Sequence, residues 1–201
     1  MKITIHRGTH EIGGSCVEVQ VEDTRIILDI GMPLVGPGGS PFEFEENGRS
    51  PQELVKDGIL PPIKGLYAGE KPTVEALIIS HPHQDHYGFI KYVHPEIPVL
   101  LGEAAHNILK AASFFMPLEI NFTTTTHFKD RQPIRIGPFE VTPYLVDHSA
   151  YDAYSIQVSA GGKNLFYSGD FRAHGRKAPL FQKLLRKPPK DVDVLLMEGS
   201  S

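Results

Sequence analysis

Short runs of apolar and β-branched residues, separated by Gly, Pro or acidic turns, dominate the pattern of this chain. Strands are expected at 2–6, 16–21 and 25–30, because Gly13-Gly14 and Glu22-Asp23 mark turns between them. The pattern also predicts helices at 87–93, 103–115 and 179–186, and a Thr-rich turn before residue 134. Further strands are expected at 74–80, 99–101, 134–136, 139–145, 155–159, 164–168 and 192–197. Strands interleaved with helices predict a layered α/β chain.

The apolar pattern breaks down between residues 31 and 73. Repeated Gly and Pro prevent a regular period there, and one short helix is expected at 51–57. We interpret 31–73 as a long Gly/Pro-rich insertion within a single domain that spans 1–201. It is either an ordinary surface insertion or a flap that borders a functional site, because loops of this length are often functional.

The strongest chemical signal is the segment HPHQDH, which directly follows an apolar run of strand length. In an extended segment residues i and i+2 point the same way, so His81 and His83 are expected to converge on one ion. A turn at Gln84 would direct Asp85 and His86 toward a neighbouring position. The spacing therefore suits two adjacent metal ions, and a polar loop with solvated histidines is the less favoured alternative.

Two more residues of ligand type follow predicted strands. His148 lies in YLVDHSA and Asp170 in LFYSGDF. Strand ends that open into loops gather ligands in layered folds, and a carboxylate can bridge two cations. We therefore expect His148 to complete a three-histidine site and Asp170 to bridge, although either residue alone is more often part of a turn or cap.

Composition narrows the class of protein. With 201 residues, of which 40% are hydrophobic and 22% charged, the chain is typical of a globular protein with one sizeable core. The net charge of −4 argues against a polybasic protein. Cys16, as the single cysteine, cannot form an internal disulfide, and no stretch has the roughly 20 apolar residues of a membrane-spanning helix. We expect a cytoplasmic protein with no membrane partner.

The HPHQDH segment matches the H-x-H-x-D-H motif, and the chain resembles the metallo-β-lactamase superfamily in this respect. Asp29 in IILDIG matches an early aspartate of that family, and His148 and Asp170 match its later ligands in order. The stretches SGDFRAHGR and LLMEGSS resemble the β-CASP branch, which includes ribonuclease J, with Glu198 at the position that opens its further motifs. The resemblance implies an αββα sandwich, which we expect to be incomplete at its C-terminus.

The resemblance also implies two divalent metal ions, with Zn expected first and Mn or Fe as alternatives. His81, His83 and His148 would hold the first ion. Asp85 and His86 would hold the second ion, and Asp170 would bind both. Asp85 would orient a water and accept its proton, so that a metal-activated hydroxide forms near neutral pH. Asp29 would hold the histidine loop from behind by hydrogen bonds, with a turn aspartate as the alternative, and Glu198 would support the ligands in the same way.

The chain departs from the family pattern at the second metal. The family normally adds another histidine there from a late strand, and His174 lies too near Asp170 to replace it. We therefore expect the N-terminal portion of a longer enzyme, or a truncated product, with an incomplete second site and poor activity by itself. An unpaired sheet edge would favour a homo-oligomer through that edge.

Basic residues gather after the last expected ligand. Residues 172–190 contain no Asp or Glu, and the substrate-binding candidates nearest the ligand are Arg172, His174, Arg176 and Lys177. Such a segment can follow a phosphate backbone, or it can simply be a solvated helix face. The leading hypothesis is metal-dependent hydrolysis of phosphodiesters in RNA. The alternatives are a hydrolase of the superfamily acting on a thioester, lactone or small phosphodiester, and a non-catalytic metal-binding fragment.

Overall fold

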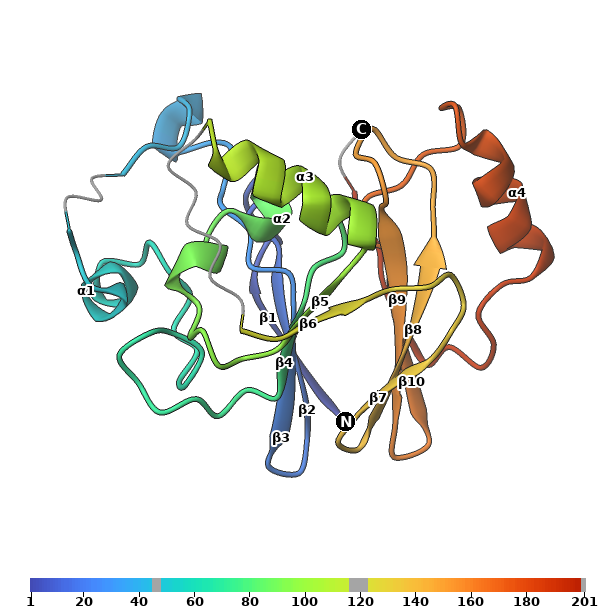
Figure 1. Cartoon of the computed structure of the whole chain (residues 1–201), viewed down its shortest axis with the longest axis horizontal. Coiled ribbons are helices and arrows are strands. Elements are labelled where there is room, and N and C mark those ends of the chain that lie inside the picture. The colour runs from blue at the N-terminus through green and yellow to red at the C-terminus, as the bar shows by residue number, and fades with distance from the viewer. Residues whose placement is uncertain (45–47, 116–122, 200–201) are drawn as a thin grey trace.

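The computed structural model describes residues 1–44, 48–115 and 123–199, in which two β-sheets face each other and helices lie outside them (Figure 1). The first sheet has the order β1 (Lys2–Arg7), β2 (Cys16–Val21), β3 (Thr24–Leu28), β4 (Ala76–Ile78), β5 (Val99–Leu101) and β6 (Thr125–His127). The second has the order β11 (Val194–Leu196), β10 (Lys163–Tyr167), β9 (Tyr154–Ala160), β8 (Phe139–Leu145) and β7 (Ile134–Ile136). The architecture is the expected αββα arrangement.

The helices cover both outer faces. Those on the side of the first sheet are α1 (Pro51–Lys56), α2 (Gln84–Tyr87) and α3 (Glu103–Ser113), together with the 3-10 turns η1 (Pro37–Gly39) and η2 (Ile90–Tyr92). Helix α4 (Ala178–Arg186) lies on the outer side of the second sheet (Figure 1). None of the helices that the structure describes is long and apolar enough to cross a membrane.

Two apolar layers hold these elements together. Side chains alternate along a strand, so in β3 Ile26 and Leu28 face the second sheet while Ile27 faces the helices. The layer between the sheets also contains Phe139 and Ile156, both fully buried. The inner strands β3, β4 and β5 are therefore apolar on both faces, which explains their continuous hydrophobic runs.

The predicted strands are present, and two local predictions are wrong. The helix expected at 87–93 begins earlier, as α2, and continues only as the short turn η2, because the Phe89 amide donates to the Ile30 carbonyl at 3.0 Å and leaves the helical path. The Thr-rich stretch expected as a turn contains β6, which pairs in parallel with β5. Only the neighbouring strand makes that segment extended.

The described parts of the insertion, 31–44 and 48–73, belong to the core as well as to the surface. Helix α1 begins with a capping box between Ser50 and Glu53. After it, the buried side chains Leu60, Leu66 and Tyr67 pack against the first sheet. The interpretation as a purely surface insertion is therefore wrong.

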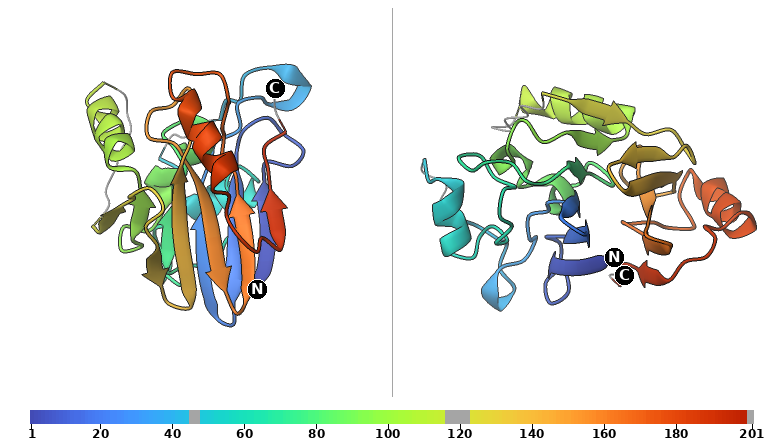
Figure 2. Two further views of the ribbon diagram at one scale, coloured as in Figure 1. Left: turned by 90° about the vertical axis from the view of Figure 1, so that its right-hand side faces the viewer. Right: turned by 90° about the horizontal axis from the view of Figure 1, so that it is seen from below.

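The edge strands of the two sheets meet on one side of the molecule. Figure 2 shows β11 beside β1 in both views. Residues of both strands line a cavity of about 270 Å³ that reaches Asp170 and Glu198. The space between these two edge strands thus reaches the expected ligands.

Candidate metal centre

The expected ligands, and Asp29 behind them, come from segments that follow four different strands. Asp29 follows β3, the HPHQDH segment follows β4, His148 follows β8 and Asp170 follows β10. Because the two sheets pack face to face, these strand ends lie together although they are far apart in sequence. The structure therefore gathers all of these residues at one end of the sandwich.

Three imidazoles form a first group. Ligand nitrogens of His81, His83 and His148 lie within 4.8 Å of one another. His148 Nε2 is 3.1 Å from His83 Nδ1, and their ring centroids are 4.8 Å apart. Three nitrogens that face a common point match the first of the two sites expected from the sequence.

A second group shares one histidine with the first. Ligand atoms of His81, His86 and Asp170 also lie within 4.8 Å of one another, and His86 Nε2 is 3.3 Å from Asp170 Oδ1. Asp85 Oδ2 lies 3.6 Å from the same His86 nitrogen. The other Asp170 oxygen, Oδ2, is 3.8 Å from His148 Nε2, so Asp170 lies between the two groups.

An unpartnered nitrogen atom of His81 indicates that these residues can hold a divalent cation. His81 Nε2 is buried and has no hydrogen-bond partner among the described residues, while its Nδ1 lies 3.0 Å from Ser80 Oγ. A buried polar atom without a partner costs about 1–3 kcal/mol. Three imidazoles and a carboxylate are a donor set that suits Zn and related metals. A cation bound here would satisfy the His81 nitrogen.

Electrostatics keep the first group neutral. Burial lowers the pKa of His81 well below its usual value, and neighbouring imidazoles lower it further. Burial also lowers the pKa of His83. The pKa of His148 falls to about 4, because burial lowers it and the nearby His83, His86 and Arg172 lower it further. Neutral imidazole is the form that binds metals, so these side chains do not have to release a proton first.

Asp29 is buried behind His86 and organises it. Its Oδ2 is 2.7 Å from His86 Nδ1 and accepts hydrogen bonds from Ser80 Oγ and the Tyr167 hydroxyl, while Oδ1 accepts from the Ser80 amide, each at 2.7 Å. Asp29 has a positive φ of 59°, which turns the chain at the end of β3. Burial lowers the pKa of His86, but Asp29 and Asp170 outweigh it and raise that pKa to about 10.

Glu198 supports the segment that follows Asp170. Its Oε1 accepts from the Phe171 amide at 2.6 Å, and its own amide donates to Ser168 Oγ at 3.0 Å. Burial, with a contribution from Asp170, raises the pKa of the Glu198 carboxyl. The Glu198 side chain thus holds the backbone just after the expected bridging ligand, and the Glu198 amide holds the Ser168 side chain just before it.

Sequence reasoning missed Asp147, which precedes His148 and is fully buried. Its carbonyl accepts from the Arg172 amide and its Oδ2 from the Gly175 amide, both at 2.7 Å. The loops that carry His148 and Asp170 are thereby joined. A carboxylate two residues after the predicted strand at 139–145 was the available signal.

The candidate substrate-binding residues occupy the loop between Asp170 and α4. Arg172 Nε lies 3.5 Å from Asp147 Oδ1, and Lys177 Nζ donates to the Ala150 carbonyl at 3.2 Å. The side chains of His174 and Arg176 are exposed. Arg172 and Lys177 are thus held beside the centre, whereas the other two face solvent.

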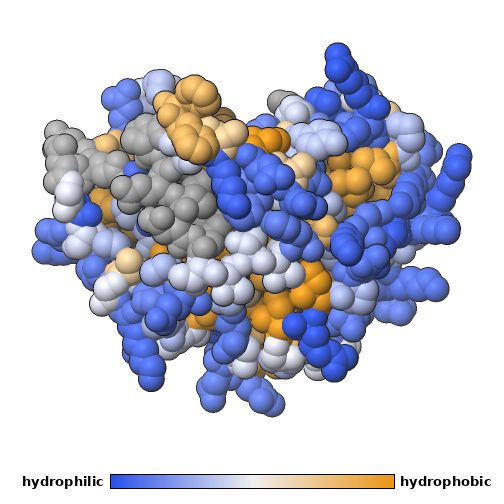
Figure 3. All heavy atoms as spheres, in the orientation of Figure 1, coloured by the Kyte–Doolittle hydropathy of each residue, from blue (hydrophilic) through white to orange (hydrophobic). Residues whose placement is uncertain are grey.

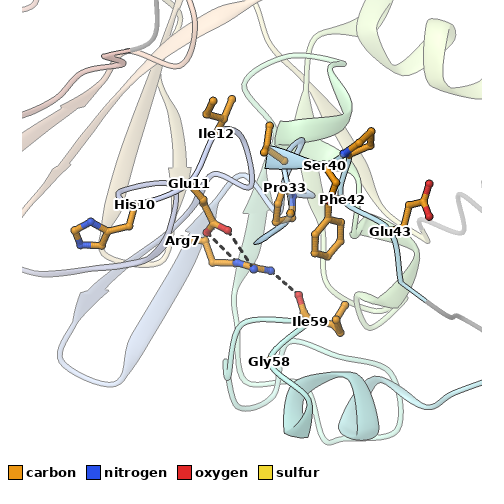
Figure 4. Close-up of a pocket in the computed structure, with 13 residues that line it drawn as sticks. Arg7, His10, Glu11, Ile12, Pro33, Ser40, Phe42, Glu43, Gly58 and Ile59 are labelled. Carbon is orange, nitrogen blue, oxygen red and sulfur yellow. Dashed lines mark hydrogen bonds and ion pairs between the residues drawn. The ribbon is translucent and has the colours of Figure 1, made fainter. Parts of the chain in front are cut away.

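A large cavity has no expected metal ligand in its lining. It has a volume of about 810 Å³, and part of the insertion, including Phe42 and Ile59, lines it. Figure 4 shows Arg7 pairing with Glu11 at its wall, and the Arg7 guanidinium also donates to the Ile59 carbonyl at 2.5 Å. None of the expected metal ligands lines this cavity, so its size does not mark the centre.

Two facing sheets with outer helices, and a histidine-aspartate cluster at their strand ends, define a metal-binding protein of the metallo-β-lactamase fold. The family model described as the Beta-lactamase superfamily domain matches residues 58–200, and the chain belongs to this superfamily. It is 28% identical over 207 residues to Ribonuclease J of Mycoplasma genitalium, an alignment that covers 100% of this chain and 33% of the relative. The chain thus spans about a third of the length of that relative.

Solved structures agree with the fold. A protein of unknown function from Enterococcus faecalis V583 superimposes with a TM-score of 0.80 and 28% identity, covering 99% of this chain and 50% of the other. The metallo-beta-lactamase fold protein YhfI from Bacillus subtilis matches with a TM-score of 0.58 and 17% identity, covering 96% and 68%. The second likeness concerns the fold alone.

Proposed function

We propose that this chain is the metal-binding portion of a β-CASP-type ribonuclease that hydrolyses phosphodiester bonds in RNA. The observation that carries the proposal is the pair of ligand groups that share His81, with Asp170 between them. Similarity to Ribonuclease J along the whole chain favours RNA over other substrates of the fold. We propose Zn as the metal, with Mn or Fe as alternatives, and the cytoplasm as the location.

Each group has a distinct role in this proposal. One ion would be held by His81, His83 and His148, a second by Asp85 and His86, and Asp170 would bind both. When bound, two divalent ions acidify a water and stabilise the negative charge that develops at phosphorus.

In this proposal the chain's own residues would position the attacking water and accept its proton. The Asp85 carbonyl accepts from the Ser15 amide at 3.1 Å, which fixes the backbone beneath its carboxylate. Asp85 would orient the attacking water and accept its proton, because its Oδ2 reaches the same space as His86 Nε2. Asp29 fixes the ring of His86, and Arg172, held by Asp147, would contact the phosphate.

Metal content and RNA cleavage together test the proposal. Elemental analysis of protein purified without added metal should find a divalent transition metal, and the double variant His81→Ala with His83→Ala should lose it. The unsubstituted chain should release mononucleotides or short fragments from RNA slowly, and the double variant should not. Retention of stoichiometric metal by the double variant would show the ligand assignment to be wrong. Turnover of a thioester or lactone without RNA cleavage would assign the centre to another hydrolase.

A further inference from the structure

A second pocket, separate from the metal centre, lies where α4 ends against the outer face of the second sheet. It has a volume of about 670 Å³, and its lining includes four basic side chains, Arg131, Arg186, Lys187 and Lys190. Hydrophilic side chains predominate at the right of Figure 3, the side on which α4 lies in Figure 1. We call it the α4 pocket.

The turn that forms one wall of the α4 pocket is fixed by side chains of the sheet and its loops. Arg131 donates to the Lys187 carbonyl at 2.6 Å, Gln157 to the Lys190 carbonyl at 3.3 Å, and Asn164 to the Asp191 carbonyl at 2.8 Å. Because these bonds hold the carbonyls inward, the Lys187 and Lys190 side chains remain exposed. The turn needs little further ordering when a ligand binds.

The pocket favours anions despite its place at a helix C-terminus. The Arg131 guanidinium lies 4.8 Å from the Tyr144 ring centroid and donates to the carbonyls of Lys183 and Lys187, so it offsets the negative end of α4. Among the residues that line the pocket, Asp191 is the one acid. Neither Lys187 nor Lys190 has a carboxylate partner within the described ranges of the chain.

Basic residues follow one another along the chain between the metal centre and the pocket. The segment after Asp170 passes Arg172 and Lys177 and then enters α4, whose nine residues span about 13 Å. A single nucleotide cannot cover that distance, whereas a strand with several phosphates can.

We infer that the α4 pocket binds the phosphate backbone of a single-stranded RNA whose scissile bond occupies the metal centre. This inference rests on the proposed function and adds a second contact, made by Lys187 and Lys190 on the turn that Arg131 holds in place. Contacts of this kind are electrostatic and independent of base sequence. The pocket should therefore strengthen binding of long substrates and leave small phosphodiesters unaffected.

The test compares two double variants of the full chain with equal changes of charge. Lys187→Glu with Lys190→Glu alters the pocket, and Lys56→Glu with Lys71→Glu alters exposed lysines beside the first sheet. With a chelator present to prevent cleavage, fluorescence anisotropy measures binding of an RNA of about 20 nucleotides across salt concentrations. The pocket variant should bind about tenfold more weakly or worse, with a salt slope smaller by about 1.4 for two lost contacts, and the control should change less than about twofold.

A small substrate separates this inference from the proposed function. Hydrolysis of bis(p-nitrophenyl) phosphate and metal content report on the centre alone, and both should be equal in the pocket variant and the unsubstituted chain. Unchanged RNA affinity in the pocket variant, or an equal loss in both variants, would overturn the inference. Loss of binding to an acidic peptide with RNA affinity unchanged would also overturn it and assign the pocket to a protein partner. Failure of the proposed function would instead appear as absent metal or absent turnover in the unsubstituted chain.

Discussion

Single buried carboxylates control the geometry of the candidate metal centre. Asp29 holds the ring of His86, and Asp147 joins the two loops that carry His148 and Asp170. Neither belongs to the two ligand groups. Residues placed behind metal ligands commonly fix ring orientation and raise metal affinity.

Replacement of Asp29 by Ala should weaken metal binding about 10- to 100-fold, because His86 loses the partner of its Nδ1. Competition titration with a chromophoric chelator measures the change. Asp23→Ala, at an exposed turn, is the matched control. Equal metal affinity in both variants would contradict the role assigned to Asp29.

Gly175→Ala should destabilise the fold by about 1–3 kcal/mol, because an added side chain overpacks a filled site. Its Cβ would lie 2.3 Å from Arg172 Nε, at the end of a flexible side chain, and 2.5 Å from Asp147 Oδ2. Asp147 is fully buried and bound to the Gly175 amide, so it cannot move aside. Urea denaturation measures the loss. Gly199→Ala, whose Cβ would have no atom within 4 Å, should be nearly neutral. The idea fails if the two variants are equally stable.

The edge strand β11 exposes apolar side chains through which it can associate with another strand. Strand β11 pairs in parallel with β10 on one side, and its apolar side chains are exposed, with Leu195 at 55% and the adjacent Met197 at 63%. Unpaired, apolar edges associate with other strands. Helix α4 differs from β11, because its exposed Leu185 lies between polar side chains that include Lys183 and Arg186.

The chain should self-associate through β11. Light scattering coupled to gel filtration should show oligomers whose share rises with concentration, and Leu195→Lys with Met197→Lys should shift the chain toward monomer. The control, Leu34→Lys with Ile108→Lys, changes side chains that are 44% and 42% exposed elsewhere and should leave association unchanged. A monomeric unsubstituted chain at high concentration would rule out this interface.

The centre also couples the stability of the molecule to pH. Without metal, His148 has a pKa of about 4 in the folded chain against 6.5 as its reference value, and the pKa values of His81 and His83 are lowered too. The unfolded chain then binds more protons between these values, so stability is present above pH 6.5 and is lost as pH falls toward 4. The raised pKa of His86 acts only at higher pH, where stability is lost as pH rises toward 10.

Thermal unfolding of the chelator-treated chain should therefore show a melting temperature that falls steadily from pH 6.5 to pH 4.5. His148→Gln should reduce this slope, since it removes one of the titrating imidazoles. His94→Gln replaces a histidine outside the centre and should leave the slope as it is. Equal slopes in all three proteins would mean that burial of the centre does not govern the acid response.

The sequence alone was sufficient to predict the features that depend on residues close together in the chain. The HPHQDH segment could be identified as a metal-binding element from its spacing, and most strands could be predicted because their side chains are buried on one or both faces. The helix expected at 87–93 failed because a hydrogen bond from Phe89 to Ile30, remote in sequence, ends it. Strand β6 was missed because pairing with β5 makes Thr125–His127 extended.

Distances between remote residues depended on how the sheets pack. His83 and His148 are separated by 65 positions yet their nitrogens lie 3.1 Å apart, and no local pattern encodes that distance. The same holds for Asp147 with Gly175 and for Arg131 with the turn after α4. Residue types and local spacing fix which side chains are able to bind a metal or a phosphate. Burial of both sheets against one another fixes which of them meet, because the apolar layers set the positions of the strand ends.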